Sequence, residues 1–396
     1  MKVRFDVAAI LVIGLLVLSS ISFPIGAGSD PDDTITLVLT GDIMTGRRVE
    51  HAINTYDDTY FPFHGIGEYT RRGDLTFGNL ETTISTRGEE ADKLCTFRAH
   101  PKTLEGVRDA GFDVLTLANN HIIDYGEDAT NDTMRYVNEY GMENVGMWYL
   151  DEPAADARID RPVVLEAKGI RFAFLGYGEN FTSLFRATDT LPGPVPMKMN
   201  IIVEDIEYAR TVADVVVVAI HWRRTPQYVK TVDETQMDIC RRLVDAGADV
   251  LACHGPHVAQ ATEFYNGSLI LYSLGNTVFD QSEPSTHQSM LAMVRLRGST
   301  IDSLSLVPLR MNQLYQYIPQ GNILELHAGN GTWLDWDDYD SLMFSSDQRL
   351  TMYQEPVRGP KYWLTRDEGI TAVLMVVIIA LLFIVIRMAK TTKKMP

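Results

Sequence analysis

The stretch Val215-Val-Val-Val-Ala-Ile-His221 is apolar and β-branched until its last residue, which is a histidine. A short run of this kind is typical of a β-strand that is covered on both faces. Val250-Leu-Ala-Cys-His254 repeats the pattern and again ends in histidine. Between the two lies Val232–Asp245, which has the composition and length of a helix. The unit of strand, helix and strand predicts an α/β fold.

The same alternation continues from Thr34 to about Leu309 and predicts further strands and helices. The expected strands are Ile35–Leu39, Leu75–Phe77, Val114–Leu117, Arg171–Leu175, Val215–Ile220, Val250–Ala252, Leu269–Tyr272 and Met290–Leu296. The expected helices are Glu127–Tyr140, Ile202–Thr211 and Val232–Asp245, the last with a capping box of Thr231 and Glu234. Because the periodicity fades past Leu309, we assign a folded domain to 30–310 and an acidic, aromatic stalk or extension to 311–368.

Polar side chains follow five of these strands at the point where each one ends. They are Asp42, Glu81, Asn119, Asn120, His121, Asp124, His221, His254 and His257. Taken singly, each has a structural interpretation, since Gly-Asp is a common turn and a histidine can be a hydrogen-bonded core residue. Turn chemistry does not account for four histidines, however. Ligands of open α/β sheets gather beyond the carboxyl ends of the strands, and mixed oxygen and imidazole ligands suit Zn, Mn, Fe or Co. The pattern therefore predicts a divalent metal site.

Composition and charge exclude two classes of protein. The chain has 396 residues, of which 45% are hydrophobic and 22% charged, so it is not a disordered chain. With 35 Lys and Arg against 52 Asp and Glu, its formal charge is −17. A generic nucleic-acid binder needs a basic face, so we expect no nucleic-acid partner. The three cysteines allow at most one disulfide bridge.

Both ends of the chain carry an uncharged apolar run with basic residues beside it. Val7–Phe23 has the pattern of a signal peptide or an uncleaved anchor, and we assign residues 1–29 to one or the other. Ile370–Ile386 is long enough for a membrane-spanning helix, assigned to 369–387, with a buried core helix as the alternative. The basic tail, 388–396, is then cytoplasmic by the positive-inside rule, and the main domain lies outside the cytoplasm at the cell membrane.

Six motifs end these strands or follow them closely. They are Gly41-Asp42-Ile-Met44, Asn79-Leu80-Glu81, Ala118-Asn119-Asn120-His121, His221-Trp222, His254-Gly255-Pro256-His257 and Leu274-Gly275-Asn276-Thr-Val-Phe279-Asp280-Gln281. Through them the sequence resembles the capsule-synthesis CapA family, also called the poly-γ-glutamate synthesis accessory proteins, from about Thr36 to Gln281. It departs from the family at Arg223 and Cys253, where glycine is usual. Compared with ordinary phosphoesterases, Met44 stands in place of a metal-binding histidine, and Glu81 in place of a bridging aspartate.

The resemblance implies a calcineurin-like metallophosphoesterase fold, which is a four-layer α-β-β-α sandwich, and two divalent metal ions such as Mn, Zn or Fe. By the same resemblance the metal ligands would be Asp42, Glu81, Asn120, His221 and His254, with His257 as a further ligand or as a neighbour of one. His121 would lie beside the substrate as general acid or charge stabiliser, and Asp124 would orient it.

The resemblance also implies a function. The protein would be membrane-anchored and would work with partner subunits in the synthesis or export of a poly-γ-glutamate-like or other anionic capsular polymer. Two alternatives stay open: a di-metal hydrolase of phosphoesters or polymer amide bonds at the cell surface, and a non-catalytic polymer-binding module. Because an acidic domain repels a polyanion, binding needs local donors and positive charge. The substrate-binding candidates are Arg47, Arg48, Asn119, Arg223, Arg224 and Asn276, with ordinary surface ion pairing as the alternative for the arginines.

Overall fold

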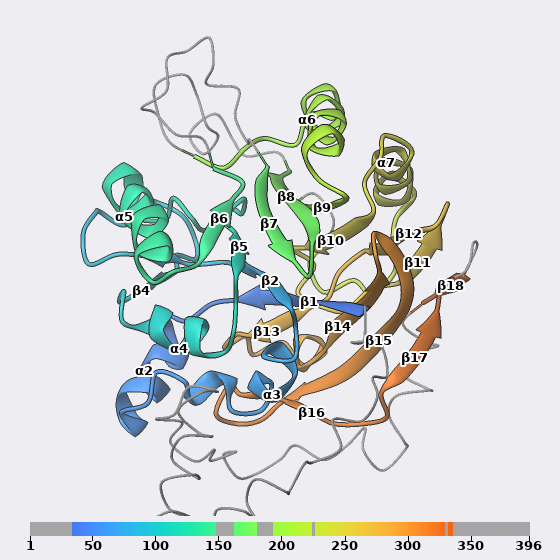
Figure 1. Cartoon of the computed structure of the whole chain (residues 1–396). Coiled ribbons are helices and arrows are strands. Elements are labelled where there is room, and N and C mark those ends of the chain that lie inside the picture. Colours follow the sequence, from blue (N-terminus) through green and yellow to red (C-terminus); the bar gives the residue numbers. More distant parts are fainter. Residues whose placement is uncertain (1–33, 148–161, 180–192, 224–225, 329–331, 336–396) are drawn as a thin grey trace, which may run out of the picture. The chain divides into compact units, whose positions relative to one another are not determined.

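Two β-sheets packed face to face form the centre of the fold, and helices cover both outer faces (Figure 1). The computed structural model describes residues 34–147, 162–179, 193–223, 226–328 and 332–335. The order of layers is therefore helices, sheet, sheet, helices. This layer order agrees with the expected four-layer sandwich. Each of the two sheets contains both parallel and antiparallel strand pairs.

The first sheet has nine strands, in the order β16-β15-β14-β1-β2-β5-β6, with β13 beside β1 and β17 beside β15. The bounds are β1 (Thr34–Ile43), β2 (Leu75–Leu80), β5 (Val114–Thr116), β6 (Glu143–Val145), β13 (Asn276–Val278), β14 (Gln288–Arg297), β15 (Thr300–Met311), β16 (Tyr317–Pro319) and β17 (Leu324–His327). Strands β1, β2, β5 and β6 are parallel, so their carboxyl ends meet at one edge.

The second sheet has seven strands, in the order β18-β11-β12-β10-β9-β8-β7. The bounds are β7 (Val163–Ala167), β8 (Ile170–Gly178), β9 (Val215–His221), β10 (Val250–His254), β11 (Thr262–Tyr265), β12 (Ser268–Leu271) and β18 (Thr332–Leu334). Strands β8, β9, β10 and β12 are parallel. A separate short pair joins β3 (Thr83–Ile84) to β4 (Arg98–Ala99).

The helices form the two outer layers. Their bounds are α2 (Arg47–Tyr56), α3 (Gly67–Thr70), α4 (Thr103–Asp109), α5 (Gly126–Glu139), α6 (Met199–Val212) and α7 (Glu234–Asp245), with 3-10 turns η1 (Phe61–Phe63) and η2 (Pro284–His287). Helices α2, α4 and α5 pack on the first sheet. Helices α6 and α7 pack on the second (Figure 1).

Successive residues of a strand face opposite sides of its sheet. Both sides are covered here, which explains why the central strands are continuously apolar. In β1, Leu37 and Leu39 face the core between the sheets, whereas Val38 faces the helices of the first sheet. In β9, Val217 faces the core between the sheets and Val216 faces the helices of the second. Both faces of β1 and β9 are buried along most of their length, so these two strands are mainly apolar until they near their ends. The polar residues are therefore concentrated at the strand ends.

All eight expected strands and all three expected helices are present, with shifted ends. One detail of the expectation is wrong. Helix α7 begins at Glu234, so its capping box is formed by Asp233 and Gln236 and not by Thr231 and Glu234. The Asp233 carboxylate accepts the Gln236 backbone N–H at 2.8 Å, and the Gln236 side chain accepts the Asp233 N–H at 3.1 Å.

Residues past the expected domain boundary at 310 extend both sheets. Strands β16 and β17 pair with β15, and β18 pairs with β11 on the outer edge of the second sheet. In the described part of the chain, no helix combines the length and the apolar character that crossing a membrane requires. The expected signal or anchor (1–29), spanning helix (369–387) and basic tail (388–396) lie outside the described residues, as does most of 311–368.

Candidate metal centre

The polar residues that end strands of the first sheet lie abreast of one another. Asp42 is near the end of β1, and the strand register sets it beside Asn79 of β2 and Asn276 of β13. The backbones approach closely here. A Cβ atom on Gly41 would lie 1.9 Å from the carbonyl oxygen of Gly275, so only glycine allows β1 and the β13 connection to meet. The Gly-Asp motif thus fixes the position of the Asp42 carboxylate.

The second sheet contributes histidines at the corresponding ends. His221 ends β9 and His254 ends β10, and the parallel register pairs the two. Gly255 then turns the chain with a φ of +108°, where a Cβ atom would lie 2.0 Å from the Trp222 carbonyl oxygen. This turn brings His257 to the same group of residues. The glycine of the His-Gly-Pro-His motif is therefore required by both φ and space.

Two buried carboxylates face these histidines. Asp42 Oδ1 lies 3.2 Å from His254 Nδ1, and Asp42 Oδ2 lies 3.1 Å from His257 Nδ1. Oε1 of Glu81, which follows β2, lies 3.8 Å from Nε2 of both His221 and His257. Ligand atoms of Asp42, Glu81 and His221 all lie within 4.8 Å of one another. The two sheets therefore bring together five of the six expected ligands.

Several polar atoms of this group are buried without a hydrogen-bond partner. They are both carboxylate oxygens of Glu81 and Nε2 of His254, while Asp42 Oδ2 and His254 Nδ1 have only the contacts between Asp42 and the two histidines given above. Burying such groups unpaired costs free energy, on the order of 1–3 kcal/mol each and more for a charge. Oxygen and imidazole lone pairs that converge in this way are what a divalent cation coordinates. The donor set therefore fits a metal ion.

Burial and neighbouring charges shift the pKa values of four residues in this group. Burial raises the pKa of Asp42, but contacts with His254 and His257 outweigh it and hold the pKa well below its usual range. Burial raises the pKa of Glu81. Burial lowers the pKa of His221 to about 3. For His257, burial lowers the pKa, but the charges of Glu81 and Asp42 outweigh it and raise the pKa to about 9. The carboxylates of Asp42 and Glu81 thus favour a positive charge at this buried position.

His121 lies on the edge of this group and is held by three neighbours. Its Nδ1 lies 2.7 Å from Asp124 Oδ2, and its ring stacks on Phe97 with centroids 3.7 Å apart. Lys93 forms an ion pair with the other oxygen of Asp124. The other ring nitrogen of His121, Nε2, lies 3.9 Å from Glu81 Oε1. Burial lowers the pKa of His121 to about 4. The ring is therefore held with Nδ1 on Asp124 and Nε2 on the side of Glu81.

The asparagines connect these residues. Asn120 Oδ1 lies 2.9 Å from His221 Nε2, and its backbone carbonyl accepts from Lys93 Nζ at 2.8 Å. The Asn119 amide is buried and donates to Asn79 Oδ1 at 3.0 Å. Asn79 in turn donates to Asp42 Oδ1 at 2.8 Å and lies 3.3 Å from His221 Nδ1. Asn120 therefore joins the expected ligands, and Asn119 contacts them through Asn79.

Asn276 and Arg47 border the group on the side of β13. Asn276 Oδ1 lies 3.0 Å from His257 Nδ1. Arg47 Nε lies 3.3 Å from Asp280 Oδ2, and its guanidinium lies 5.2 Å from the centre of the Phe97 ring that stacks on His121. These contacts connect Arg47 to the histidine through one aromatic ring.

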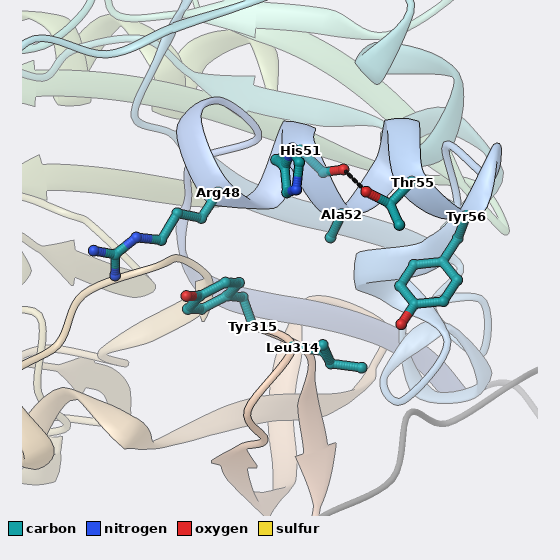
Figure 2. A pocket seen from close by; sticks show the side chains of 7 residues that line it. All are labelled: Arg48, His51, Ala52, Thr55, Tyr56, Leu314 and Tyr315. Atoms are coloured by element: carbon teal, nitrogen blue, oxygen red, sulfur yellow. Dashed lines mark hydrogen bonds between the residues drawn. The ribbon is translucent and has the colours of Figure 1, made fainter.

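The other arginines lie differently. The Arg48 side chain lines a hollow of about 360 Å³ beside α2 (Figure 2). The residues around it are Arg48, His51, Ala52, Thr55, Tyr56, Leu314 and Tyr315, none of them an expected metal ligand. Arg223 is exposed, and its backbone N–H donates to Glu179 Oε2 at 3.0 Å. Arg224 lies outside the described residues.

Three residues of the site were not expected. Asn79 belongs to the Asn79-Leu80-Glu81 motif, of which only Glu81 was expected in the site. The position of Asn79 near the end of a strand could have indicated its role. Lys93 and Phe97 lie in the long loop between β3 and β4, where no periodicity or motif indicates their partners. Only the folded chain brings them to His121 and Asp124.

With this geometry established, comparison with known proteins identifies the family. A family model described as bacterial capsule synthesis protein PGA_cap matches residues 36–281. The chain belongs to this family. The resemblance expected from the six motifs is thus confirmed, and the PGA_cap match includes every expected metal ligand, since all lie between Asp42 and His257.

The sequences of curated relatives align with most of the chain. Capsule biosynthesis protein CapA of Bacillus anthracis is 34% identical over 290 residues, which are 71% of this chain and 69% of the relative. PGA biosynthesis protein CapA of Bacillus subtilis (strain 168) is 31% identical over 285 residues, 71% of this chain and 73% of the relative. A solved 5'-nucleotidase precursor from Thermus thermophilus is 10% identical, with a TM-score of 0.42, over 72% of this chain and 56% of that one.

Proposed function

We propose that this PGA_cap protein holds divalent metal ions in the candidate centre and assists the synthesis or export of an anionic capsular polymer of the poly-γ-glutamate kind. The observation that carries the proposal is the pair of buried carboxylates, Asp42 and Glu81, which face imidazole rings, with neither oxygen of Glu81 accepting a hydrogen bond. Such a pair has no role in packing alone, because buried carboxylates without a full set of donors destabilise a core. The names of the two Bacillus relatives supply the polymer class.

In this proposal the centre binds two ions of Mn, Zn or Fe, in a fold of the calcineurin-like metallophosphoesterase kind. Their ligands would be Asp42, Glu81, Asn120, His221 and His254, with His257 as a further ligand or a neighbour of one. The ions would act as Lewis acids that polarise a bound carboxylate, amide or phosphate. Asn79 orients Asp42 through its amide. His257, held by Asn276, contributes an imidazole between the two carboxylates.

We further propose that the protein is anchored at the cell membrane, with the domain outside the cytoplasm and partner subunits of a synthase or export complex beside it. The support is in the sequence of the two ends, where apolar runs at Val7–Phe23 and Ile370–Ile386 are accompanied by basic residues. The ends would hold the acidic domain at the surface where polymer emerges.

The test uses a polyglutamate-producing bacterium whose own family member has been deleted. The full chain and its Glu81→Gln variant are expressed at equal levels in this strain, and polymer released from the cell surface is measured. The proposal predicts restored polymer with the wild-type chain and at least a tenfold loss with Glu81→Gln. His51→Ala is the matched control, because His51 is exposed and lines only the hollow beside α2. Equal restoration by Glu81→Gln would contradict the role of the centre.

A second candidate function is hydrolysis of phosphoesters or polymer amide bonds by the same centre. The contact between His121 and Asp124 favours it, because a buried imidazole that is held at one nitrogen and has the other on the side of Glu81 is suited to proton transfer. Turnover of a generic phosphodiester and of polyglutamate by the metal-loaded chain tests this candidate. Metal binding and polymer binding without turnover would favour the non-catalytic, polymer-binding alternative.

A further inference from the structure

Two cysteines lie close together between the second sheet and the helices that cover it. Cys240 lies on α7 and Cys253 on β10, and neither side chain has exposed surface. Their sulfur atoms are 3.9 Å apart. In a disulfide the sulfur atoms are about 2.0 Å apart, so small rotations of the two side chains would span the difference. The fold therefore holds two thiols close to bonding distance across two different elements.

The alternation of β10 decides which way Cys253 points. Leu251 and Cys253 belong to the apolar cluster between the sheet and its helices, whereas Val250 and Ala252 belong to the core between the sheets. Cys240 belongs to the same outer cluster as Cys253. Cys253 therefore faces α7 and is not a soft ligand of the neighbouring metal centre, although the next residue is His254.

We propose that Cys240 and Cys253 form a disulfide, a covalent modification site of this chain. The proposal rests in part on the proposed location of the domain outside the cytoplasm, where thiols are oxidised. The bond would form while the chain folds, before apolar side chains cover both sulfurs. Cys95 is not part of the pair, because it is exposed and its sulfur accepts a hydrogen bond from Arg47 Nη1 at 3.4 Å.

The chemistry is thiol–disulfide exchange with a low-molecular-weight disulfide as oxidant. The sulfur of one cysteine loses its proton and attacks the oxidant, which forms a mixed disulfide and releases one thiol. The sulfur of the second cysteine loses its proton and displaces the second thiol, which completes the protein disulfide. The protein loses two protons and two electrons, and the oxidant gains them as two thiols.

The bond would have a consequence for the metal centre. It would attach α7 to β10 one residue before His254, which ends that strand. The bridge would close a short loop of chain from 240 to 253, and this limits the conformations of the unfolded state. The strand that carries one of the expected ligands would thus be fixed to the helix layer behind it.

The test measures thiols directly in the full chain. The purified protein is unfolded and reduced, then refolded in a buffer of oxidised and reduced glutathione, and the remaining thiols are alkylated. Mass spectrometry of the digest should find the peptides of Cys240 and Cys253 joined and only Cys95 alkylated. Reductant should then lower the thermal unfolding midpoint by roughly 5–10 °C. Cys95→Ser should give the same bridge and the same shift.

Alkylation of all three cysteines in refolded protein, or a bridge that uses Cys95, would overturn the proposal. A double variant, Cys240→Ala with Cys253→Ala, should unfold at one temperature with or without reductant. Metal content measured on the same samples keeps the two proposals separate. A bridged protein without metal would contradict the metal centre alone, and a metal-loaded protein with three free thiols would contradict the disulfide alone.

Discussion

The Nδ1 atom of His121 lies 2.7 Å from the Oδ2 atom of Asp124, and this contact fixes the direction of the imidazole ring. The opposite nitrogen, Nε2, lies 3.9 Å from Glu81 Oε1. His121 is thus positioned beside the expected ligands and is held from behind by a carboxylate. This arrangement separates two roles that mutations can test: the residues that would hold metal, and the residue that would meet the substrate.

The first prediction concerns His121. If the centre hydrolyses its substrate, His121→Ala should lower kcat by roughly 10²–10³-fold, because the variant lacks the group suited to proton transfer. Metal content, measured by elemental analysis, should stay at the wild-type value, since His121 is not among the expected ligands. Loss of metal together with activity would instead identify His121 as a ligand, and unchanged turnover would exclude it from the reaction.

The second prediction concerns Lys93. Its ammonium group forms an ion pair with Asp124, whose side chain has no exposed surface. Lys93→Met should leave that carboxylate without its cation and lower the free energy of unfolding by about 1–3 kcal/mol, measured by chemical denaturation. Lys93→Arg should recover part of the loss. Lys102→Met, which removes a half-buried lysine whose ammonium group donates an exposed hydrogen bond to Asn54, is the control and should change stability by less than about 0.5 kcal/mol.

The third prediction concerns Asp132 on α5, whose side chain is only 2% exposed. Arg87 contacts it with two nitrogens, at 2.7 and 2.9 Å, and Ser85 and Arg135 also donate to it. The hydrogen bonds from Arg87 hold the pKa of Asp132 well below its usual range. Asp132→Asn should therefore lower the free energy of unfolding by about 1–2 kcal/mol at pH 7.

The sign of the pH dependence follows from the lowered pKa of Asp132. The stabilisation is fully present above the pKa of the unfolded carboxyl group, about 3.9, and is lost as the pH falls through the lower value of the folded state. The difference between wild type and Asp132→Asn should be constant from pH 5 to pH 8 and shrink below about pH 4. Glu139→Gln, which removes an exposed partner of Arg135, should show a difference below about 0.5 kcal/mol.

The fourth prediction concerns Arg47, which lies over Phe97 and is 36% exposed. If Arg47 contacts an anionic polymer, Arg47→Ala should weaken polyglutamate binding by roughly 5–10-fold, measured by calorimetry at low salt. Arg72→Ala is the matched control, because Arg72 is exposed and already paired with Glu68. Equal binding by Arg47→Ala and Arg72→Ala would mean that Arg47 is an ordinary surface ion-pair residue.

Much of the fold was predictable because its strands are buried on both faces. Continuous apolar runs such as Val215–His221 and Val250–His254 have few other interpretations. The edge strands β16, β17 and β18 were harder to predict. Each is three or four residues long, and β17 and β18 are partly exposed to solvent. Their sequences show little alternation of apolar and polar residues. Pairing with strands distant in sequence, rather than local propensity, stabilises their β conformation.

The expected ligands were predictable because parallel strands bring their carboxyl ends together, so residues far apart in sequence share one edge. His254 lies beside His221 for this reason, and Asn79 beside Asp42. The residues around His121 were not predictable in the same way. Lys93 and Phe97 come from the loop region before β4, and a loop has no register from which to infer its contacts. Cys240 and Cys253 show the same limit, because a helix and a strand can pack at many offsets.

The central claim is that Asp42, Glu81 and the histidines facing them hold metal. The direct measurement is the metal content of the purified full chain after exposure to Mn²⁺, Zn²⁺ or Fe²⁺ and removal of excess ions, compared with Glu81→Gln and His51→Ala. The account predicts about two ions per chain in the wild type and in His51→Ala, and at least one fewer in Glu81→Gln. A folded wild-type chain that retains none of these ions, or a Glu81→Gln variant that retains as many as the wild type, would contradict it.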